Sequence, residues 1–368
     1  MTINPLEIRR KRRKQALKRA RKERRAAKRA RELENRPAPV PFVVGVNRSG
    51  TTLLRMMLDS HPDLAIPPET HFIPALFDAV KERRKAGDRM SAAEVVDFLV
   101  QHRRWGDFGL DEAVLLERIE KDKKVRPKNV LRAFYQLYAE NQGKTRYGDK
   151  TPGYVKQMGI VHRTLPESRF IHLIRDGRDV ALSREDRTDD EDMTVERHAK
   201  IWKRRINRAR GQVPRIKHYV EVRYEDLVDD PESVLRTICE FIELPFDSAM
   251  LSYHERSADR LQEIARDLDD EDGGALRPAV ERMEAHSLVT EAPRSDRVGR
   301  WRESMDPGDV AQFEAIAGDL LDDLGYEVST PEGRETVASA LAESEAESAA
   351  ESASPSASGS GSGLGGNS

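Results

Sequence analysis

The stretch that decides the fold is Gly45-Val-Asn-Arg-Ser-Gly-Thr-Thr52, which ends the apolar run Pro41–Val46 and opens the amphipathic segment Thr51–Ser60. A strand, a glycine-containing turn and a helix in this order are typical of a phosphate-binding loop. Glycines let the backbone approach an anion, and the helix N-terminus presents N–H groups to it. The nucleotide-hydrolase pattern G-x-x-x-x-G-K-[ST] has lysine where this chain has Thr51. Arg48 supplies a cation inside the loop instead, so an ordinary ATPase is not expected.

Two further apolar runs, Arg169–Ile174 and His218–Tyr224, each lead into a turn and a helix. Short apolar runs that alternate with longer helical patterns are typical of a mostly parallel α/β sheet. After the last run, Asp230 and Pro231 are suited to cap and open a helix. The charged stretch 78–142 is expected to form two or more helices. We therefore predict an α/β protein with a P-loop-like three-layer fold, in which helices flank a central, mostly parallel sheet.

Charge divides the chain into three parts. Residues 1–36 hold 16 Lys or Arg against 4 Asp or Glu, residues 331–368 hold 1 against 6, and the middle holds 46 against 55. This pattern predicts a basic arm over 1–37, helical or disordered, then a globular domain over 38–330 and a disordered acidic tail rich in Ser, Gly and Ala over 331–368. The basic stretch 6–33 could bind an anionic surface, either a membrane or a nucleic acid, or act only as a solubilising segment.

The apolar stretches and the cysteine content bear on location. The longest purely apolar stretches run to a few residues, whereas roughly 20 are needed to cross a bilayer. The charged start lacks the apolar region of a secretory signal. The single cysteine, Cys239, permits no disulfide within the chain and suits a reducing compartment. A cytoplasmic location is therefore expected, and Cys239, beside an apolar helical stripe, is expected to be a core residue.

Several motifs carry a resemblance to a known family. Val46–Pro62 (VNRSGTTLLRMMLDSHP) and Pro68–Pro74 (PETHFIP) resemble the opening of the sulfotransferase family, most of all its tyrosylprotein sulfotransferase branch. Phe170–Ser183 (FIHLIRDGRDVALS) is similar to the second loop of that family, which has an arginine and a serine eight residues apart. Val222–Leu227 (VRYEDL) and Val298–Trp301 (VGRW) follow in the family order. The last motif departs from the family, in which a lysine usually follows the tryptophan.

This resemblance implies an enzyme that moves a sulfuryl group from 3′-phosphoadenosine 5′-phosphosulfate (PAPS) to an acceptor hydroxyl of a tyrosine, a carbohydrate, or a small alcohol or phenol. By the same resemblance the first loop binds the 5′-phosphosulfate, Arg175 and Ser183 hold the 3′-phosphate, and Tyr224 lies near the adenosine. Gly299 and Arg300 belong to a segment that covers it. The implied set of residues that bind the sulfuryl donor is Arg48, Ser49, Gly50, Thr51, Thr52, Arg175, Ser183, Tyr224, Gly299 and Arg300.

The resemblance also implies the catalytic residues. In the tyrosylprotein branch the base is a glutamate 21 residues beyond the loop arginine, which corresponds to Glu69, and Lys150 falls in register with the catalytic lysine. Glu69 is then the general base, while Lys150 and Arg48 stabilise the charge of the sulfuryl and leaving groups. Without the resemblance, the sequence around Glu69 would indicate only a surface carboxylate. No His-x-x-x-His or comparable spacing occurs, so no metal is expected.

Two other functions stay open at this point. The chain could be a binding module that keeps the nucleotide fold without turnover, or it could be a phosphate-loop kinase. Thr51 at the lysine position and a set of cations that needs no Mg²⁺ disfavour the kinase. The sequence does not indicate the acceptor or the oligomeric state, since a fold does not fix a substrate.

Overall fold

The computed structural model describes residues 36–121, 125–186, 193–269, 275–284 and 286–329. The chain divides into two units, residues 1–39 and 40–368, and the description below concerns the second. Nearly all of the predicted basic arm and the whole acidic tail lie outside the described residues. The domain boundaries and the location in the cytoplasm stay predictions. Among the described helices there is none both long and apolar enough to cross a membrane.

The central sheet has four parallel strands in the order β4-β1-β5-β6. These are β1 (Val40–Gly45), β4 (Asp149–Lys150), β5 (Ser168–Ile174) and β6 (Tyr219–Arg223). Every residue of β1 and β5 is buried, as expected for parallel strands covered on both faces. The three strands predicted from apolar runs are confirmed with ends shifted by one residue, whereas the two-residue strand β4 was not predicted. Two smaller sheets have two strands each. In the first, β2 (Leu64–Ala65) pairs in parallel with β3 (Arg146–Tyr147), and in the second, β7 (Leu268–Asp269) pairs antiparallel with β8 (Ala275–Arg277).

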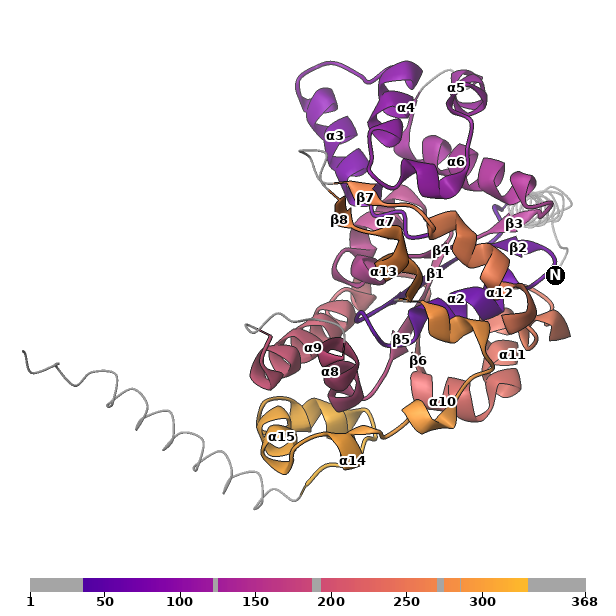
Figure 1. Cartoon of the computed structure of the whole chain (residues 1–368). Helices are drawn as coiled ribbons and strands as arrows, with labels where there is room; N and C mark the ends of the chain where they lie inside the picture. Colours follow the sequence, from indigo (N-terminus) through magenta and orange to yellow (C-terminus); the bar gives the residue numbers. More distant parts are fainter. Residues whose placement is uncertain (1–35, 122–124, 187–192, 270–274, 285, 330–368) are drawn as a thin grey trace, which may run out of the picture. The chain divides into compact units, whose positions relative to one another are not determined.

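Helices follow the strands and cover both faces of the sheet (Figure 1). The described α-helices are α2 (Thr51–Asp59), α3 (Ile73–Lys85), α4 (Ala92–Val100), α5 (Glu112–Glu120), α6 (Pro127–Asn141), α7 (Met158–Thr164), α8 (Gly177–Glu185), α9 (Val195–Arg210), α10 (Tyr224–Asp229), α11 (Pro231–Phe241), α12 (His254–Leu261), α13 (Ala279–Glu284), α14 (Trp301–Ser304) and α15 (Pro307–Asp323). The described 3₁₀ helices are η1 (Trp105–Phe108), η2 (Pro152–Lys156), η3 (Val213–Arg215), η4 (Ser248–Met250), η5 (Gln262–Ile264), η6 (Ser287–Thr290) and η7 (Ser295–Arg297).

Alternate residues of β1 point into different cores, which confirms the three-layer fold. Phe42 belongs to the same core cluster as Phe134 of α6, whereas its neighbour Val43 belongs to the cluster that includes Leu54 of α2 and Ile238 of α11. This follows from the two-residue period of a strand. The stretch 78–142 forms α4, α5, α6 and most of α3, which gather at the top of Figure 1 and confirm the helical prediction.

Two local predictions on α11 are also confirmed. Asp230 caps the helix, since its Oδ1 accepts a hydrogen bond from the N–H of Ser233 at 3.0 Å, and Pro231 is its first residue. Cys239 is buried beside the sulfur of Met250, and burial raises the pKa of its thiol to about 11. Cys239 is therefore a core residue rather than a nucleophile.

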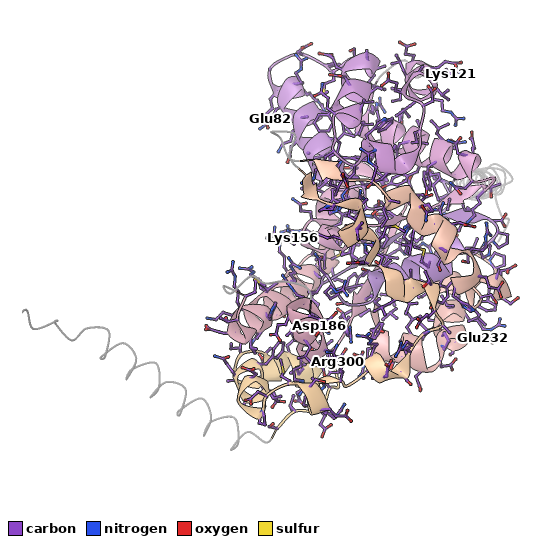
Figure 2. The ribbon with its side chains drawn as sticks, viewed as in Figure 1. Glu82, Lys121, Lys156, Asp186, Glu232 and Arg300 are labelled. Carbon is purple, nitrogen blue, oxygen red and sulfur yellow. The ribbon has the colours of Figure 1, made fainter. Side chains whose placement is uncertain are left out.

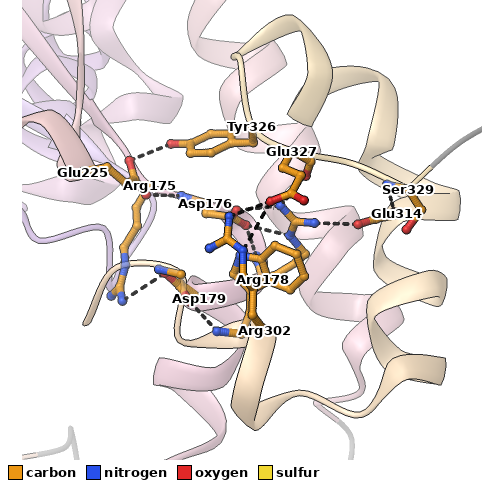
Figure 3. A network of polar contacts seen from close by, with 12 residues as sticks. Arg175, Asp176, Arg178, Asp179, Glu225, Arg302, Glu314, Tyr326, Glu327 and Ser329 are labelled. Carbon is orange, nitrogen blue, oxygen red and sulfur yellow. Dashed lines mark hydrogen bonds and ion pairs between the residues drawn. The ribbon is translucent and has the colours of Figure 1, made fainter. Parts of the chain in front are cut away.

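A buried ionic network joins the turn after β5 to the C-terminal helix α15 (Figure 3). Arg178 donates to both carboxylate oxygens of Asp176 at 3.0 and 2.7 Å, to Oε1 of Glu314 at 2.5 Å, and to the carbonyl of Glu327 at 2.7 Å. Its guanidinium lies 3.5 Å from the ring centroid of Trp301. Because these buried charges are paired and hydrogen-bonded, the network holds the turn in one position. That turn carries part of the site described next.

Candidate active site

A cavity opens at the carboxyl ends of β1, β5 and β6, where ligands commonly bind in open parallel sheets. Ten of the residues implied by the resemblance line it: Arg48, Gly50, Thr51, Thr52, Glu69, Lys150, Arg175, Ser183, Tyr224 and Arg300. Two do not. Ser49 is buried, and Gly299 donates its N–H to Oδ2 of Asp179 at 2.8 Å. The fold thus brings together residues that lie in six separate stretches of sequence.

The first loop makes a tight turn between β1 and α2. Arg48 and Gly50 have φ angles of 78° and 85°, in the left-handed region, and the N–H of Ser49 donates to the carbonyl of Val46 at 3.1 Å. Thr51 and Thr52 form the first turn of α2, whose N–H groups have no partner within the helix. The loop therefore has the geometry of an anion-binding site.

The second loop, after β5, meets the first directly. Nε of Arg48 donates to Oγ of Ser183 at 3.1 Å, and Nη1 of Arg175 donates to the carbonyl of Arg48 at 3.2 Å. Nη2 of Arg175 donates to the carbonyl of Arg297 at 2.6 Å and lies 3.7 Å from Oδ2 of Asp179. Nε of Arg175 is buried without a hydrogen-bond partner among the described residues. Two arginines and a serine thus converge at one end of the cavity.

Tyr224 covers the first loop from the start of α10. Its ring is buried, and the guanidinium of Arg175 lies 4.7 Å from its centroid. A Cβ atom on Gly50 would lie only 2.3 Å from Cδ2 of Tyr224. The glycine is therefore needed both for its backbone angle and for the close approach of this ring.

We expect Gly50→Ala to lower the free energy of unfolding by more than Gly87→Ala does. Gly87 has a similar φ of 82°, so both variants incur the left-handed cost of about 1–2 kcal/mol, but no described atom lies within 4 Å of a Cβ at Gly87. Only Gly50→Ala must also displace Tyr224. Urea unfolding compares the two variants. Equal losses would show that Tyr224 does not rest on this loop.

The segment after α13 is tied to α8 beside the cavity. The carboxylate of Asp179 accepts from the N–H of Gly299 at 2.8 Å and from that of Trp301 at 2.9 Å. Arg300 donates to both oxygens of Asp186 at 2.6 and 3.1 Å, and the two side chains lie together in Figure 2. The resemblance was loose in this region, yet the segment does border the cavity through Arg300.

Glu69 faces Lys150 across the cavity wall. Nζ of Lys150, whose side chain is 3% exposed, donates to Oε1 of Glu69 at 2.7 Å. Nε2 of His71 lies 2.7 Å from Oε2, and Nη2 of Arg104 lies 3.9 Å from the same oxygen. Between Glu69 and His71, the buried Thr70 donates to Oδ2 of Asp149 at 2.8 Å. That anchor fixes the backbone between Glu69, which lines the cavity, and His71, which does not.

The charges around Glu69 decide its protonation. Burial alone would raise the pKa of this carboxyl, but Lys150, the hydrogen bond from His71 and Arg104 together hold the pKa well below its ordinary value of 4.5. Burial lowers the pKa of Lys150, and its proximity to Glu69 opposes that shift. Glu69 is therefore ionised at neutral pH and available as a proton acceptor.

His286 and Arg104 are among the cavity residues that were not found from the sequence. Nδ1 of His286 lies 3.3 Å from Oγ1 of Thr52, 234 residues away in the chain, and burial lowers the pKa of His286 to about 3. Arg104 lies between α4 and η1, and its Nη1 is 3.8 Å from Oδ2 of Asp107. Both residues line the cavity. Neither belongs to a motif, so only the folded structure could reveal them.

Histidines near Glu69 in sequence do not build a metal site. His61 lies elsewhere, with its Nε2 at 2.9 Å from the carbonyl of Pro245. In the part of the chain that the structure describes, no group of three or more His, Cys, Asp or Glu residues is placed to hold a metal ion. The expectation that no metal is needed stays a prediction.

Comparisons with known proteins point to one family. The family model described as "Sulfotransferase family" matches residues 39–248. Protein-tyrosine sulfotransferase 1 of Danio rerio is 28% identical over 301 residues, which cover 80% of this chain and 74% of that protein. The protein-tyrosine sulfotransferase of Drosophila melanogaster is 26% identical over 300 residues, covering 80% of this chain and 52% of that protein. Among solved structures, the sulfotransferase domain of the Synechococcus PCC 7002 olefin synthase is similar in fold, with a TM-score of 0.52 at 24% identity, covering 80% of this chain and 96% of that domain.

Proposed function

Because this chain belongs to the sulfotransferase family, we propose that it transfers a sulfuryl group from PAPS to an acceptor hydroxyl, with the tyrosine side chain of a protein or peptide as the first acceptor to test. The family match includes both loops, Glu69 and Lys150. The choice of tyrosine is supported by relatives that are named protein-tyrosine sulfotransferases. Carbohydrates, small alcohols and phenols are the other acceptors of the same chemistry.

One observation carries the proposal: a cavity that joins two anion-binding loops to an ionised carboxylate and a buried lysine. In the proposed complex, Arg48 and the start of α2 bind the 5′-phosphosulfate, and Arg175 and Ser183 bind the 3′-phosphate. The residues fit such a ligand, because Nε of Arg175 is buried and has no hydrogen-bond partner in the described chain. An anionic ligand would satisfy it. Tyr224 supplies an aromatic wall for the adenosine.

The proposed reaction requires one base and several cations. The carboxylate of Glu69 takes the proton of the acceptor hydroxyl while the hydroxyl oxygen bonds to sulfur. The bond from sulfur to the phosphate oxygen breaks, and its electron pair stays on the leaving phosphate. Lys150 and Arg48 stabilise that charge. Lys150 now donates to Oε1 of Glu69 and lies 3.5 Å from Oγ1 of Thr52, so a short movement of its Nζ brings it towards the phosphate loop.

The proposal is tested by an assay of PAPS-dependent sulfuryl transfer to tyrosine peptides, sugars, phenols and lipid alcohols. We expect transfer to at least one acceptor class, and tyrosine peptides are tried both with and without neighbouring carboxylates because Arg104 lines the cavity. Thermal shift with adenosine 3′,5′-bisphosphate and ATP runs in parallel, since a ligand at 100 times its dissociation constant adds about 2.7 kcal/mol of stability. Stabilisation by ATP alone would favour a kinase, and stabilisation by the bisphosphate without any transfer would favour a binding module.

We expect Arg175→Ala to remove the preference for a 3′-phosphate. Loss of a charge-assisted contact of about 1.5–3 kcal/mol should weaken binding of adenosine 3′,5′-bisphosphate about 10- to 100-fold, with little effect on adenosine 5′-phosphate. Lys150→Ala, which acts at the other end of the cavity, should keep the preference. Calorimetric titration with both nucleotides measures it. An unchanged preference in Arg175→Ala would show that the second loop does not bind this phosphate.

A further inference from the structure

The hydrogen bonds of Glu69 are divided between its two oxygens. Oε1 accepts from Lys150 at 2.7 Å, and Oε2 lies 2.7 Å from Nε2 of His71. In the described part of the chain these two side chains account for the hydrogen bonds of this carboxylate. Since Glu69 is ionised, Nε2 of His71 carries the hydrogen and donates it.

The Lys150 contact cannot persist through the proposed reaction. Oε1 must become free to take the proton of the acceptor, and Lys150 must turn to the leaving group. The hydrogen bond from His71 then alone restrains the carboxylate, because Arg104 stays 3.9 Å away, beyond hydrogen-bond distance. A base that is held at one oxygen can present the other in a fixed direction.

The position of His71 suits this task. Glu69 lines the cavity, whereas His71 is not part of the lining and its side chain is 39% exposed. His71 has a φ of 54°, which is costly for a residue other than glycine. The anchored Thr70 precedes it, with its N–H donating to Oγ1 of Thr151 at 3.0 Å. The backbone is thus held in a strained angle that sets the imidazole behind the carboxylate.

We propose that His71 is the positioning residue of the general base: its Nε2–H holds Oε2 of Glu69 so that Oε1 faces the acceptor hydroxyl. This inference rests on the proposed sulfuryl transfer. His71 itself does not touch the reacting atoms.

The test compares His71→Leu with His71→Gln, because both keep the same backbone strain and only the glutamine keeps a side-chain donor. We expect His71→Leu to lower kcat about 10- to 100-fold with an unchanged KM for PAPS. His71→Gln should recover most of this loss.

Each outcome is decisive. Parental kcat in His71→Leu would overturn the inference while leaving the proposed function intact. If His71→Leu fails to fold, His71→Asn takes its place, because its shorter side chain cannot reach Oε2 of Glu69. A kcat equal to that of His71→Gln would contradict the role of His71, and a kcat about 10- to 100-fold lower would support it. A parent without any PAPS-dependent transfer would overturn the proposed function and this inference together.

Discussion

Glu69→Gln is expected to lose about 10²- to 10⁴-fold in turnover while it folds normally and binds adenosine 3′,5′-bisphosphate like the parent. Glutamine has the size of glutamate, and its amide oxygen can still accept from Lys150, now at 2.7 Å from Oε1. It cannot take a proton from the acceptor. The loss should therefore fall on kcat and leave nucleotide affinity unchanged, as measured by steady-state kinetics and calorimetry.

A matched control separates this effect from the general loss of a charge. Glu221 is also partly buried and paired, with its Oε2 2.8 Å from Nη2 of Arg210, but it does not line the cavity. Glu221→Gln should retain parental turnover. Comparable losses in the two variants would mean that the decrease reflects stability rather than proton transfer.

The pH dependence of the parent follows from the lowered pKa of Glu69. The reaction needs the ionised carboxylate, and its pKa lies well below 4.5 because Lys150, His71 and Arg104 outweigh its burial. Glu69 therefore stays ionised throughout the range from about pH 5 to 8, and its own acidic limb falls below that range. Steady-state rates of the parent from about pH 4 to 8 locate this limb.

Lys150→Met is expected to lower turnover about 10²- to 10³-fold, the cost of removing one stabiliser of developing charge. It should also change the pH profile. Lys150 provides the largest effect that lowers the pKa of Glu69, and burial opposes it. Removal of Lys150 should therefore raise the pKa of Glu69 above its value in the parent. Because only ionised Glu69 is active, the acidic limb of the rate should move to higher pH.

Steady-state rates from about pH 4 to 8 measure this shift. Lys203→Met serves as the control, since Lys203 pairs with Asp319 at 2.7 Å and does not line the cavity. Its profile should match the parent. If the acidic limb of Lys150→Met stays at the same pH as in the parent, the ion pair with Lys150 does not set the pKa of Glu69.

Local signals explain what could be predicted from the sequence. The apolar run of β1, the glycine turn and the amphipathic helix α2 are adjacent, so the first loop could be inferred from neighbouring residues alone. The Asp230 cap has the same origin. Glu69 and Lys150 lie 81 positions apart. Their assignment to one site came only from the family resemblance, and their hydrogen bond was not predicted.

The remaining site residues had no local signal. The bond between His71 and Glu69 depends on the left-handed angle of His71 and on the burial of Thr70, and neither feature is encoded in a pattern of residue types. Arg104 and His286 come from stretches made of short helices and turns, where hydrophobic periodicity is weak. Their place in the cavity is set by packing between distant segments.

The most direct test of the account is single-turnover transfer of labelled sulfuryl from PAPS to a tyrosine peptide by the parent and by Glu69→Gln, each saturated with PAPS. We predict label on the tyrosine oxygen with the parent and a rate about 10²- to 10⁴-fold lower with Glu69→Gln. Equal rates in the two proteins would contradict the assignment of Glu69 as the base. Absence of transfer by the parent to this and every other hydroxyl acceptor would contradict the proposed function itself.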